Sequence, residues 1–273
     1  MFPHIVLKLF GYGIYGSTSD FLMSMSVLFA LMVTPVALHK EISFLKSVAI
    51  VFLVSLSAFI GARLFHVVWE RPEHFINNPG EIFTRFDGMT FYGAFFAGLA
   101  TFALLLRRRP LSTQEKAWDV GAIICAFLLG VLRVSCFAVG CCWGSPTAVP
   151  WAVRYYDSSS AMPWLGIPVH PVQLYESASA FIIAALLLFL KIKKPKSSGL
   201  LIYIFCIFYS LVRFELEKFR GDSFRGVDLV AGLSTSQLLS ILIGLISAGV
   251  LVYKLRHQLH ERKILNSLAG SEV

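Results

Sequence analysis

The chain has 273 residues, of which 56% are hydrophobic and only 15% are charged, and its mean hydropathy is +0.71. A soluble domain of this length carries roughly 25% charged residues, so the composition excludes an ordinary soluble domain and indicates a chain buried in lipid. The formal net charge of +8 is spread over separate loops without any nucleic-acid-reading module, so no nucleic-acid partner is expected.

Seven apolar stretches follow one another along the chain. A helix needs about 20 apolar residues to cross a hydrocarbon layer ~30 Å thick. The sequence therefore predicts an all-α integral membrane protein of about seven transmembrane helices, forming a single domain over residues 1–273. The expected helices cover residues 21–38, 47–69, 91–106, 118–137, 172–190, 199–214 and 237–254. Before them, residues 1–15 are interpreted as a segment that lies on the membrane surface.

The basic residues indicate the orientation. Lysine and arginine gather after the first, third, fifth and seventh expected helices, most densely at residues 107–109 and 191–196. Cytoplasmic loops hold the excess of lysine and arginine. The N-terminus is therefore expected outside and the C-terminus in the cytoplasm.

Five groups of polar residues interrupt the apolar pattern. An ionisable side chain inside a membrane helix costs about 2.5–3.5 kcal/mol on insertion scales, so it usually faces a partner or a cavity and serves function. The first group is Arg63 with His66, and the second is residues 87–94 around Tyr92. The others are Arg133, Cys136, Gly140, Cys141, Cys142 and Gly144; then His170, Gln173, Tyr175 and Glu176; then Tyr209, Arg213, Glu217 and Arg220.

Each group also has a purely structural interpretation. Arg63 could extend to the headgroups, the segment at His170 could cap a helix, and residues 209–220 could form a solvated, ion-paired helix end. The topology nevertheless places all five groups toward the outer side. Their convergence predicts a cavity open to the outer half of the bilayer. Because the planar fork of arginine suits phosphate, the expected ligand is a phospholipid headgroup.

These residues, in this order, resemble the prolipoprotein diacylglyceryl transferase family, from Tyr12 to Arg220. The resemblance implies a bacterial inner-membrane enzyme with seven transmembrane helices. It further implies that phosphatidylglycerol donates its diacylglyceryl group to the lipobox cysteine of a preprolipoprotein, with release of glycerol phosphate. Arg133, Gly140 and Gly144 fall on the family's signature, residues 170–176 on its HPxQLYE element, and the fifth group on its tyrosine, arginine, glutamate and arginine.

The resemblance also has departures. Tyr92 stands where the family has a histidine that is proposed as a base, and Cys136 and Cys141 stand where it has asparagine and glutamate. A tyrosine, with a pKa of about 10, is a poor base at neutral pH unless a nearby arginine lowers its pKa. The phosphate-binding half of the site is thus expected to be retained, and the acceptor half to be altered.

The resulting hypothesis is a monomeric membrane transferase without a cofactor or metal, whose acceptor is a lipoprotein thiol or another nucleophile. Arg133 and Arg213 are expected to hold the phosphate, and Tyr92 to accept a proton. The expected substrate-binding residues are Arg63, His170, Gln173, Tyr175, Glu176, Tyr209, Glu217, Arg220, Gly140, Gly144, Cys136 and Cys141. The alternative hypothesis is a non-transferase that uses Cys136, Cys141 and Cys142 for metal binding or thiol redox chemistry.

Overall fold

The computed structural model describes residues 4–9, 12–70, 72–81, 91–158, 160–193, 199–222 and 232–269. The chain divides into two compact units. The first comprises residues 1–26 and 118–273, and the second comprises residues 27–117.

The described chain is helical, and each of the seven predicted apolar stretches is largely helix. The helices are α1 (Thr18–Ala37), α2 (Phe44–Phe65), the π-helix η1 (His66–Glu70), α3 (Pro72–Asn77), α5 (Phe91–Leu106), α6 (Leu111–Val139), α7 (Val172–Lys193), α8 (Leu201–Leu216), the 3-10 turn η2 (Glu217–Phe219) and α9 (Thr235–Ala269). Helix α6 begins before the expected residue 118 and α9 continues past 254. These extensions are rich in Gln, Glu, Lys and Arg, which are good helix formers although they are polar.

Five helices are long and apolar enough to cross a membrane. They are α1, α2 with its extension to Val68, α6, α7 and α9 up to His260. Helices α5 and α8 have 16 residues each, which corresponds to about 24 Å and is shorter than a typical span. Length and composition thus establish a multi-pass helical protein with five candidate membrane helices in the described part of the chain.

The N-terminal segment departs from a wholly helical fold. Strands β1 (His4–Leu9) and β2 (Tyr12–Ser17) pair antiparallel, with His4 opposite Ser17. Valine, isoleucine and tyrosine recur in these strands and favour extended backbone. The prediction missed this hairpin because its apolar residues were interpreted as a lipid-facing surface.

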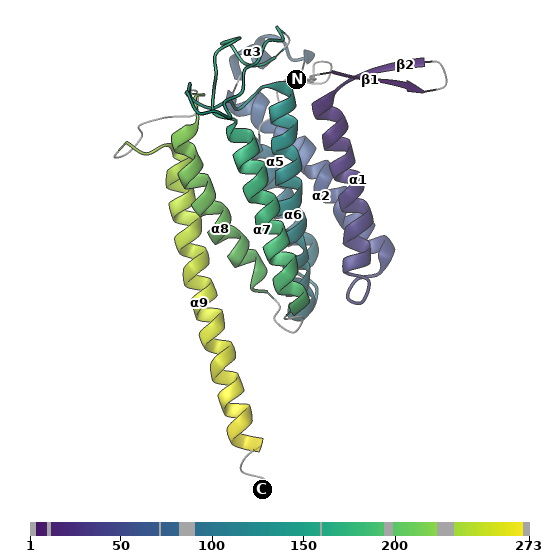
Figure 1. Cartoon of the computed structure of the whole chain (residues 1–273). Coiled ribbons are helices and arrows are strands. Elements are labelled where there is room, and N and C mark those ends of the chain that lie inside the picture. Colours follow the sequence, from purple (N-terminus) through teal and green to yellow (C-terminus); the bar gives the residue numbers. More distant parts are fainter. Residues whose placement is uncertain are drawn as a thin grey trace. The chain divides into compact units, whose positions relative to one another are not determined.

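In the first unit, helices α6, α7 and α8 pack around an apolar core that includes Ala126, Ile183, Leu187 and Phe205. Figure 1 shows α8 and α9 side by side, with α9 projecting beyond the end of α8. The buried carboxylate of Asp119 in α6 accepts the backbone N–H groups of Gly199 and Leu201, each at 2.9 Å. This side chain therefore fixes the beginning of α8 against α6.

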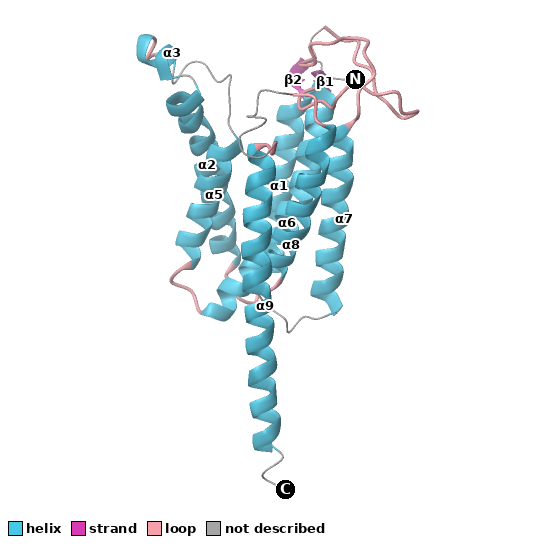
Figure 2. Ribbon diagram, turned by 90° about the vertical axis from the view of Figure 1, so that its left-hand side faces the viewer, coloured by secondary structure: helices cyan, strands magenta, loops and turns pink. Residues whose placement is uncertain are grey.

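The loops of this unit gather at the hairpin end of the helices (Figure 2). The segment after α6 joins the segment after η2, because Gly221 N–H donates to Trp143 O at 3.0 Å and Ser145 N–H donates to Phe219 O at 2.8 Å. Tyr155, Met162 and Val169 form a small apolar core within the loop between α6 and α7. These contacts fix the ends of α6, α7 and α8 relative to one another.

In the second unit, α2 and α5 pack closely at Gly61 and Gly93. A Cβ atom added at either glycine would collide with the backbone of the other. Glycines at such a crossing let two helices approach closely, as is common between membrane helices. The hydroxyl of Ser57 donates to Ala97 O at 3.5 Å across the same interface.

Candidate functional site

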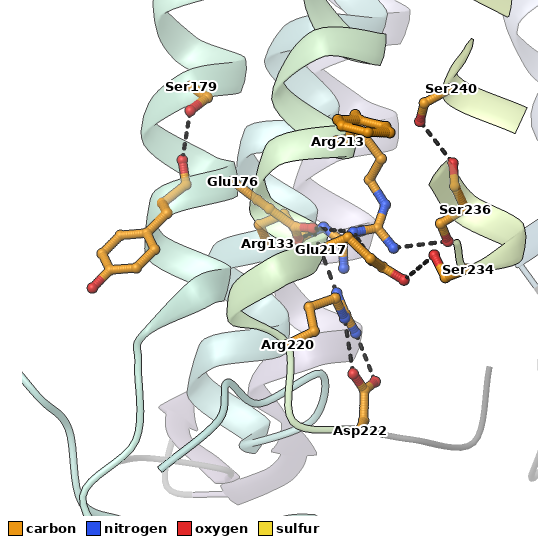
Figure 3. Close-up of polar contacts among 12 residues, drawn as sticks. Arg133, Glu176, Ser179, Arg213, Glu217, Arg220, Asp222, Ser234, Ser236 and Ser240 are labelled. Atoms are coloured by element: carbon orange, nitrogen blue, oxygen red, sulfur yellow. Dashed lines mark hydrogen bonds and ion pairs between the residues drawn. The ribbon is translucent and has the colours of Figure 1, made fainter. Parts of the chain in front are cut away.

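Glu176, one turn into α7, is the centre of a buried network of charges (Figure 3). Its Oε2 lies 2.6 Å from Nε of Arg133 in α6, and its Oε1 lies 3.2 Å from Nη1 of Arg213 in α8. Nη1 of Arg220 lies 3.5 Å from the same Oε1. The contact with Arg133 is an ion pair rather than a well-aligned hydrogen bond. One carboxylate therefore holds three arginines from three segments.

Arg213 is surrounded by further partners. Its Nη1 lies 2.7 Å from Oε2 of Glu217, one turn later in the chain, and its Nη2 donates to the hydroxyl of Ser236 at 3.0 Å. The other oxygen of Glu217 accepts the hydroxyl of Ser234 at 2.8 Å. Both serines lie at the beginning of α9, so the network joins α7, α8 and α9 (Figure 3).

Arg220 is held differently. Its Nε and Nη2 donate to the two carboxylate oxygens of Asp222 at 2.8 and 2.6 Å, a bidentate arrangement. The backbone of Arg220 also bridges to Gly144. Arg220 therefore orders the loops at this end of the first unit.

Arg133 is the most exposed of the three arginines. Its side chain is 14% exposed, against 10% for Arg213 and 4% for Arg220. Its closest contact with Glu176 is through Nε, and among the described residues neither of its terminal nitrogens donates a hydrogen bond to a carboxylate. The network holds three arginines and three carboxylates, so the buried charges balance. The balance lowers the cost of burying them.

The loops around the network use several of the predicted residues. The side chain of Gln173 is fully buried and donates from Nε2 to Cys141 O at 2.7 Å and to the hydroxyl of Tyr155 at 3.2 Å. Burial raises the pKa of Tyr155 to about 12, so its hydroxyl stays protonated. Oε1 of Gln173 has no hydrogen-bond partner among the residues that the structure describes, so this buried oxygen is an unused acceptor.

His170 and Tyr175 belong to an aromatic cluster. Nδ1 of His170 lies 3.3 Å from the hydroxyl of Tyr175, and both rings contact Phe219. Trp151 Nε1 donates to the same tyrosine hydroxyl at 2.6 Å. Tyr209 stacks on Phe205 in α8 and interacts electrostatically with Arg133.

The two predicted glycines have clear steric roles. Gly140 has φ +82°, a conformation that L side chains rarely adopt, and a Cβ atom there would collide with Ser160. A Cβ atom at Gly144 would collide with the backbone oxygen of His170. Both positions therefore need the absence of a side chain.

The three cysteines lie together at the end of α6. The Sγ atoms of Cys136, Cys141 and Cys142 all lie within 4.8 Å of one another, and none of the three is in a disulfide. Hydrogen bonding with Cys136 and Cys142, together with burial, raises the pKa of the Cys141 thiol.

The structure brings the third, fourth and fifth predicted groups together in the first unit. Arg63 belongs to the second unit, where Nη2 donates to Glu81 O at 3.0 Å and the guanidinium lies 5.0 Å from the centre of the Phe75 ring. Tyr92 lies in α5, in the same unit, and its side chain is outside the described part of the structure. Residues of three groups therefore lie in one unit, whereas the outer cavity and the places of the other two groups in it stay predictions.

Sequence reasoning missed Asp222, Ser234 and Ser236. A signal for the serines was present, because Ser234 and Gln237 have the spacing of a capping box. In the structure, Ser234 N–H donates to Gln237 Oε1 at 3.0 Å, and Gln237 N–H donates to Ser234 Oγ at 3.2 Å. Recognising this motif would have placed the beginning of the last helix before 237 and its serines beside the network. Asp222 had no comparable signal.

Comparisons with known proteins agree on one family. A family model described as prolipoprotein diacylglyceryl transferase matches residues 7–253, which include the whole network. The phosphatidylglycerol–prolipoprotein diacylglyceryl transferase of Bordetella bronchiseptica is 34% identical over 209 residues, covering 76% of this chain and 77% of that protein. The enzyme of the same name from Clostridium tetani is 28% identical over 260 residues, covering 92% of this chain and 96% of that protein. The chain therefore belongs to the prolipoprotein diacylglyceryl transferase family.

Proposed function

We propose that this transferase moves the diacylglyceryl group of phosphatidylglycerol to the cysteine thiol of a prolipoprotein, at the outer half of a bacterial inner membrane. The observation that carries the proposal is the geometry of Arg133. Glu176 contacts its guanidinium most closely through Nε, while neither terminal nitrogen donates a hydrogen bond to a described carboxylate. Such a fork, placed in an apolar helix, suits a lipid phosphate. The choice of donor and acceptor follows the reaction that the names of the relatives describe.

The chemistry needs one group transfer. The sulfur of the acceptor forms a bond with the glyceryl carbon that carries the phosphate, and the bond from that carbon to the phosphate oxygen breaks. The phosphate oxygen keeps the electron pair and leaves as glycerol phosphate, while the thiol proton passes to a base. A positive group placed in advance at the departing oxygen lowers the barrier, because charge develops there in the transition state. Arg133 is that group in our proposal.

We propose a different role for Arg213 from the one expected from the sequence. Its two terminal nitrogens are engaged by Glu176, Glu217 and Ser236, which leaves no fork for a phosphate. We therefore assign Arg213 as a positioning residue that keeps Glu176 in place, with Glu217 and Arg220 as its supports. Tyr92 stays the proposed proton acceptor.

The other predicted residues form the proposed walls of the lipid site. Oε1 of Gln173 is an unused acceptor among the described residues, and a glycerol hydroxyl of the donor headgroup is a suitable partner for it. Gly144 lets the loop lie close to the start of α7, and Gly140 lets it pack against Ser160 and Tyr155. Arg63, His170, Tyr175, Tyr209, Cys136 and Cys141 remain proposed contacts to the donor or the acceptor.

The proposed topology has seven crossings with the N-terminus outside. It counts α5 and α8 as spans in addition to the five long apolar helices. Basic residues after the first, third, fifth and seventh helices support this orientation. The arginine network then lies toward the outer leaflet, where both a phospholipid headgroup and an exported lipoprotein precursor are available.

Expression in a bacterial strain depleted of its own diacylglyceryl transferase tests the proposal. We expect the chain to restore growth and lipoprotein lipidation, and Arg133→Ala, expressed and inserted equally, to fail. With purified protein, labelled phosphatidylglycerol should label a lipobox peptide and release glycerol phosphate, whereas a peptide with serine in place of its cysteine should stay unlabelled. Lipid consumption without peptide labelling would contradict the proposed acceptor. An inserted wild-type chain that neither restores lipidation nor consumes lipid would overturn the function.

A further inference from the structure

The three thiols at the end of α6 form a compact cluster that takes no part in the bond changes of the proposed transfer. Cys136 lies in the last turn of α6, and Cys141 and Cys142 lie in the turn that follows. Adjacent side chains usually diverge, but here Gly140 has φ +82° and Cys142 has φ +58°. These two left-handed residues fold the turn back, so the three Sγ atoms lie within 4.8 Å of one another.

We propose that Cys136, Cys141 and Cys142 form a three-thiolate site for a soft, thiophilic metal ion, with Cu(I) as its best-suited occupant. Metal–sulfur bonds of about 2.3 Å place the sulfurs of three thiolates about 3.8–4.0 Å apart, so small side-chain rotations would close the site. Thiolates select soft ions such as Cu(I) and zinc over magnesium or calcium. A Cu(I) ion can be bound by three ligands in a trigonal arrangement, so the cluster needs no fourth ligand.

The backbone that carries the thiols is held firmly. Cys141 N–H and Gly140 N–H both donate to Cys136 O, at 3.1 and 2.9 Å. Gln173 donates to Cys141 O at 2.7 Å, and Ser160 donates to Val139 O at 3.4 Å. A turn fixed in this way loses little freedom on binding an ion, which favours affinity.

The cluster lies beside two arginines. Arg133 interacts electrostatically with Cys136 and Cys142, and Arg220 interacts with Cys142. Three thiolates with one Cu(I) carry a net negative charge, so the loaded site would place an anion beside Arg133. If the proposed function holds, bound metal therefore weakens the use of the anionic donor lipid.

Metal binding by the purified full-length chain tests the site. We expect the wild type to take up one Cu(I) per chain in competition with a chromophoric Cu(I) chelator. Cys136→Ala, Cys141→Ala and Cys142→Ala should each lower the affinity by at least about tenfold, since each removes one of three bonds. Cys125→Ala and Cys206→Ala are matched controls, because both thiols are free and lie within apolar stretches of α6 and α8.

Three outcomes would overturn the site. One is an affinity for Cu(I) that is the same in the wild type and in a variant with all three cysteines changed to alanine. Another is an equal loss of affinity in the two control variants. The third is a stable disulfide within the cluster after purification without oxidant, detected by counting thiols against the five in the chain.

The effect on the enzyme is measured separately as the ratio of transfer rates with and without Cu(I). We expect this ratio to fall for the wild type and to stay near one for Cys142→Ala, whatever the basal rate of that variant. Equal inhibition of both would overturn the link to the donor lipid. Because binding is read without lipid, failure of the metal site and failure of the transferase proposal give different results.

Discussion

At the scale of single residues, Glu176 shows how a membrane helix accommodates several arginines. Its side chain is 6% exposed and contacts Arg133, Arg213 and Arg220. Removing one partner of a buried ion pair is strongly destabilising, because the remaining charge stays buried without compensation. Glu176 is therefore expected to contribute to stability as much as to function.

The change Glu176→Gln tests that expectation. It should lower the free energy of unfolding by about 3–5 kcal/mol, measured as a fall in the thermal unfolding midpoint in detergent. Glu215→Gln is the matched control, because Glu215 is 61% exposed and pairs only with Lys218 among its described neighbours. An exposed pair of this kind contributes about 0–1 kcal/mol. Equal effects of the two changes would contradict the central role of Glu176.

Arg133 is expected to act mainly on the reaction. If it neutralises the departing phosphate, Arg133→Ala should lower the transfer rate by about 10²–10³-fold, the usual cost of losing one group that stabilises transition-state charge. Arg133→Lys should recover only part of the rate, because a point charge does not reproduce the planar fork. Rates are measured with labelled phosphatidylglycerol.

The control for Arg133 is Arg154→Ala. Arg154 is exposed in the long loop, where it donates to Gly166 O at 2.6 Å. Its loss should leave the rate near that of the wild type. Full activity of Arg133→Ala in folded, inserted protein would refute the assignment.

At the scale of elements, the start of α8 depends on a residue from another helix. Asp119 is fully buried in α6, accepts Gly199 N–H and Leu201 N–H, and lies 3.6 Å from Lys191 Nζ. The first N–H groups of a helix have no partner within it, and buried unpaired donors cost about 1–3 kcal/mol each. Asp119 supplies the missing acceptors.

Asp119→Ala should therefore destabilise the protein by about 1–3 kcal/mol, and Asp119→Asn should cost less because one acceptor remains. Asp119 precedes Arg133 by 14 residues of helix, or about 21 Å. The folded fraction should accordingly keep its transfer rate per molecule. Thermal unfolding measures the loss of stability, and the transfer rate divided by the amount of folded protein measures the effect on the reaction. A loss of rate without a loss of stability would contradict the capping role.

At the scale of the whole molecule, the orientation decides whether the network can meet its substrates. A reporter fused after Val273 should be cytoplasmic, and one inserted in the loop between Gly144 and Gly166 should be outside. Reporter activity and labelling of introduced cysteines by an impermeant reagent measure both positions. The reverse result would place the network toward the cytoplasm and would remove the basis for a shared outer cavity.

The sequence by itself determined the class of the protein, the approximate helices and the family. Apolar stretches of nearly membrane-spanning length leave little choice of structure in lipid, because the backbone must satisfy its own hydrogen bonds there. Charged residues inside such stretches are costly, so Arg133 and Arg213 were visible as candidate site residues. Helix ends were less certain, because polar residues after an apolar stretch continue α6 and α9 without changing the pattern.

Only the tertiary structure decided how the arginines differ. Sequence spacing shows which residues share a helix face, whereas the pairing of Glu176 with arginines from three segments depends on how α6, α7 and α8 pack. The same packing brings both terminal nitrogens of Arg213 into polar contacts, whereas those of Arg133 donate no hydrogen bond to a described carboxylate. The turn that brings the three thiols together was also not predictable from the sequence. It depends on left-handed backbone at Cys142, which a cysteine rarely adopts.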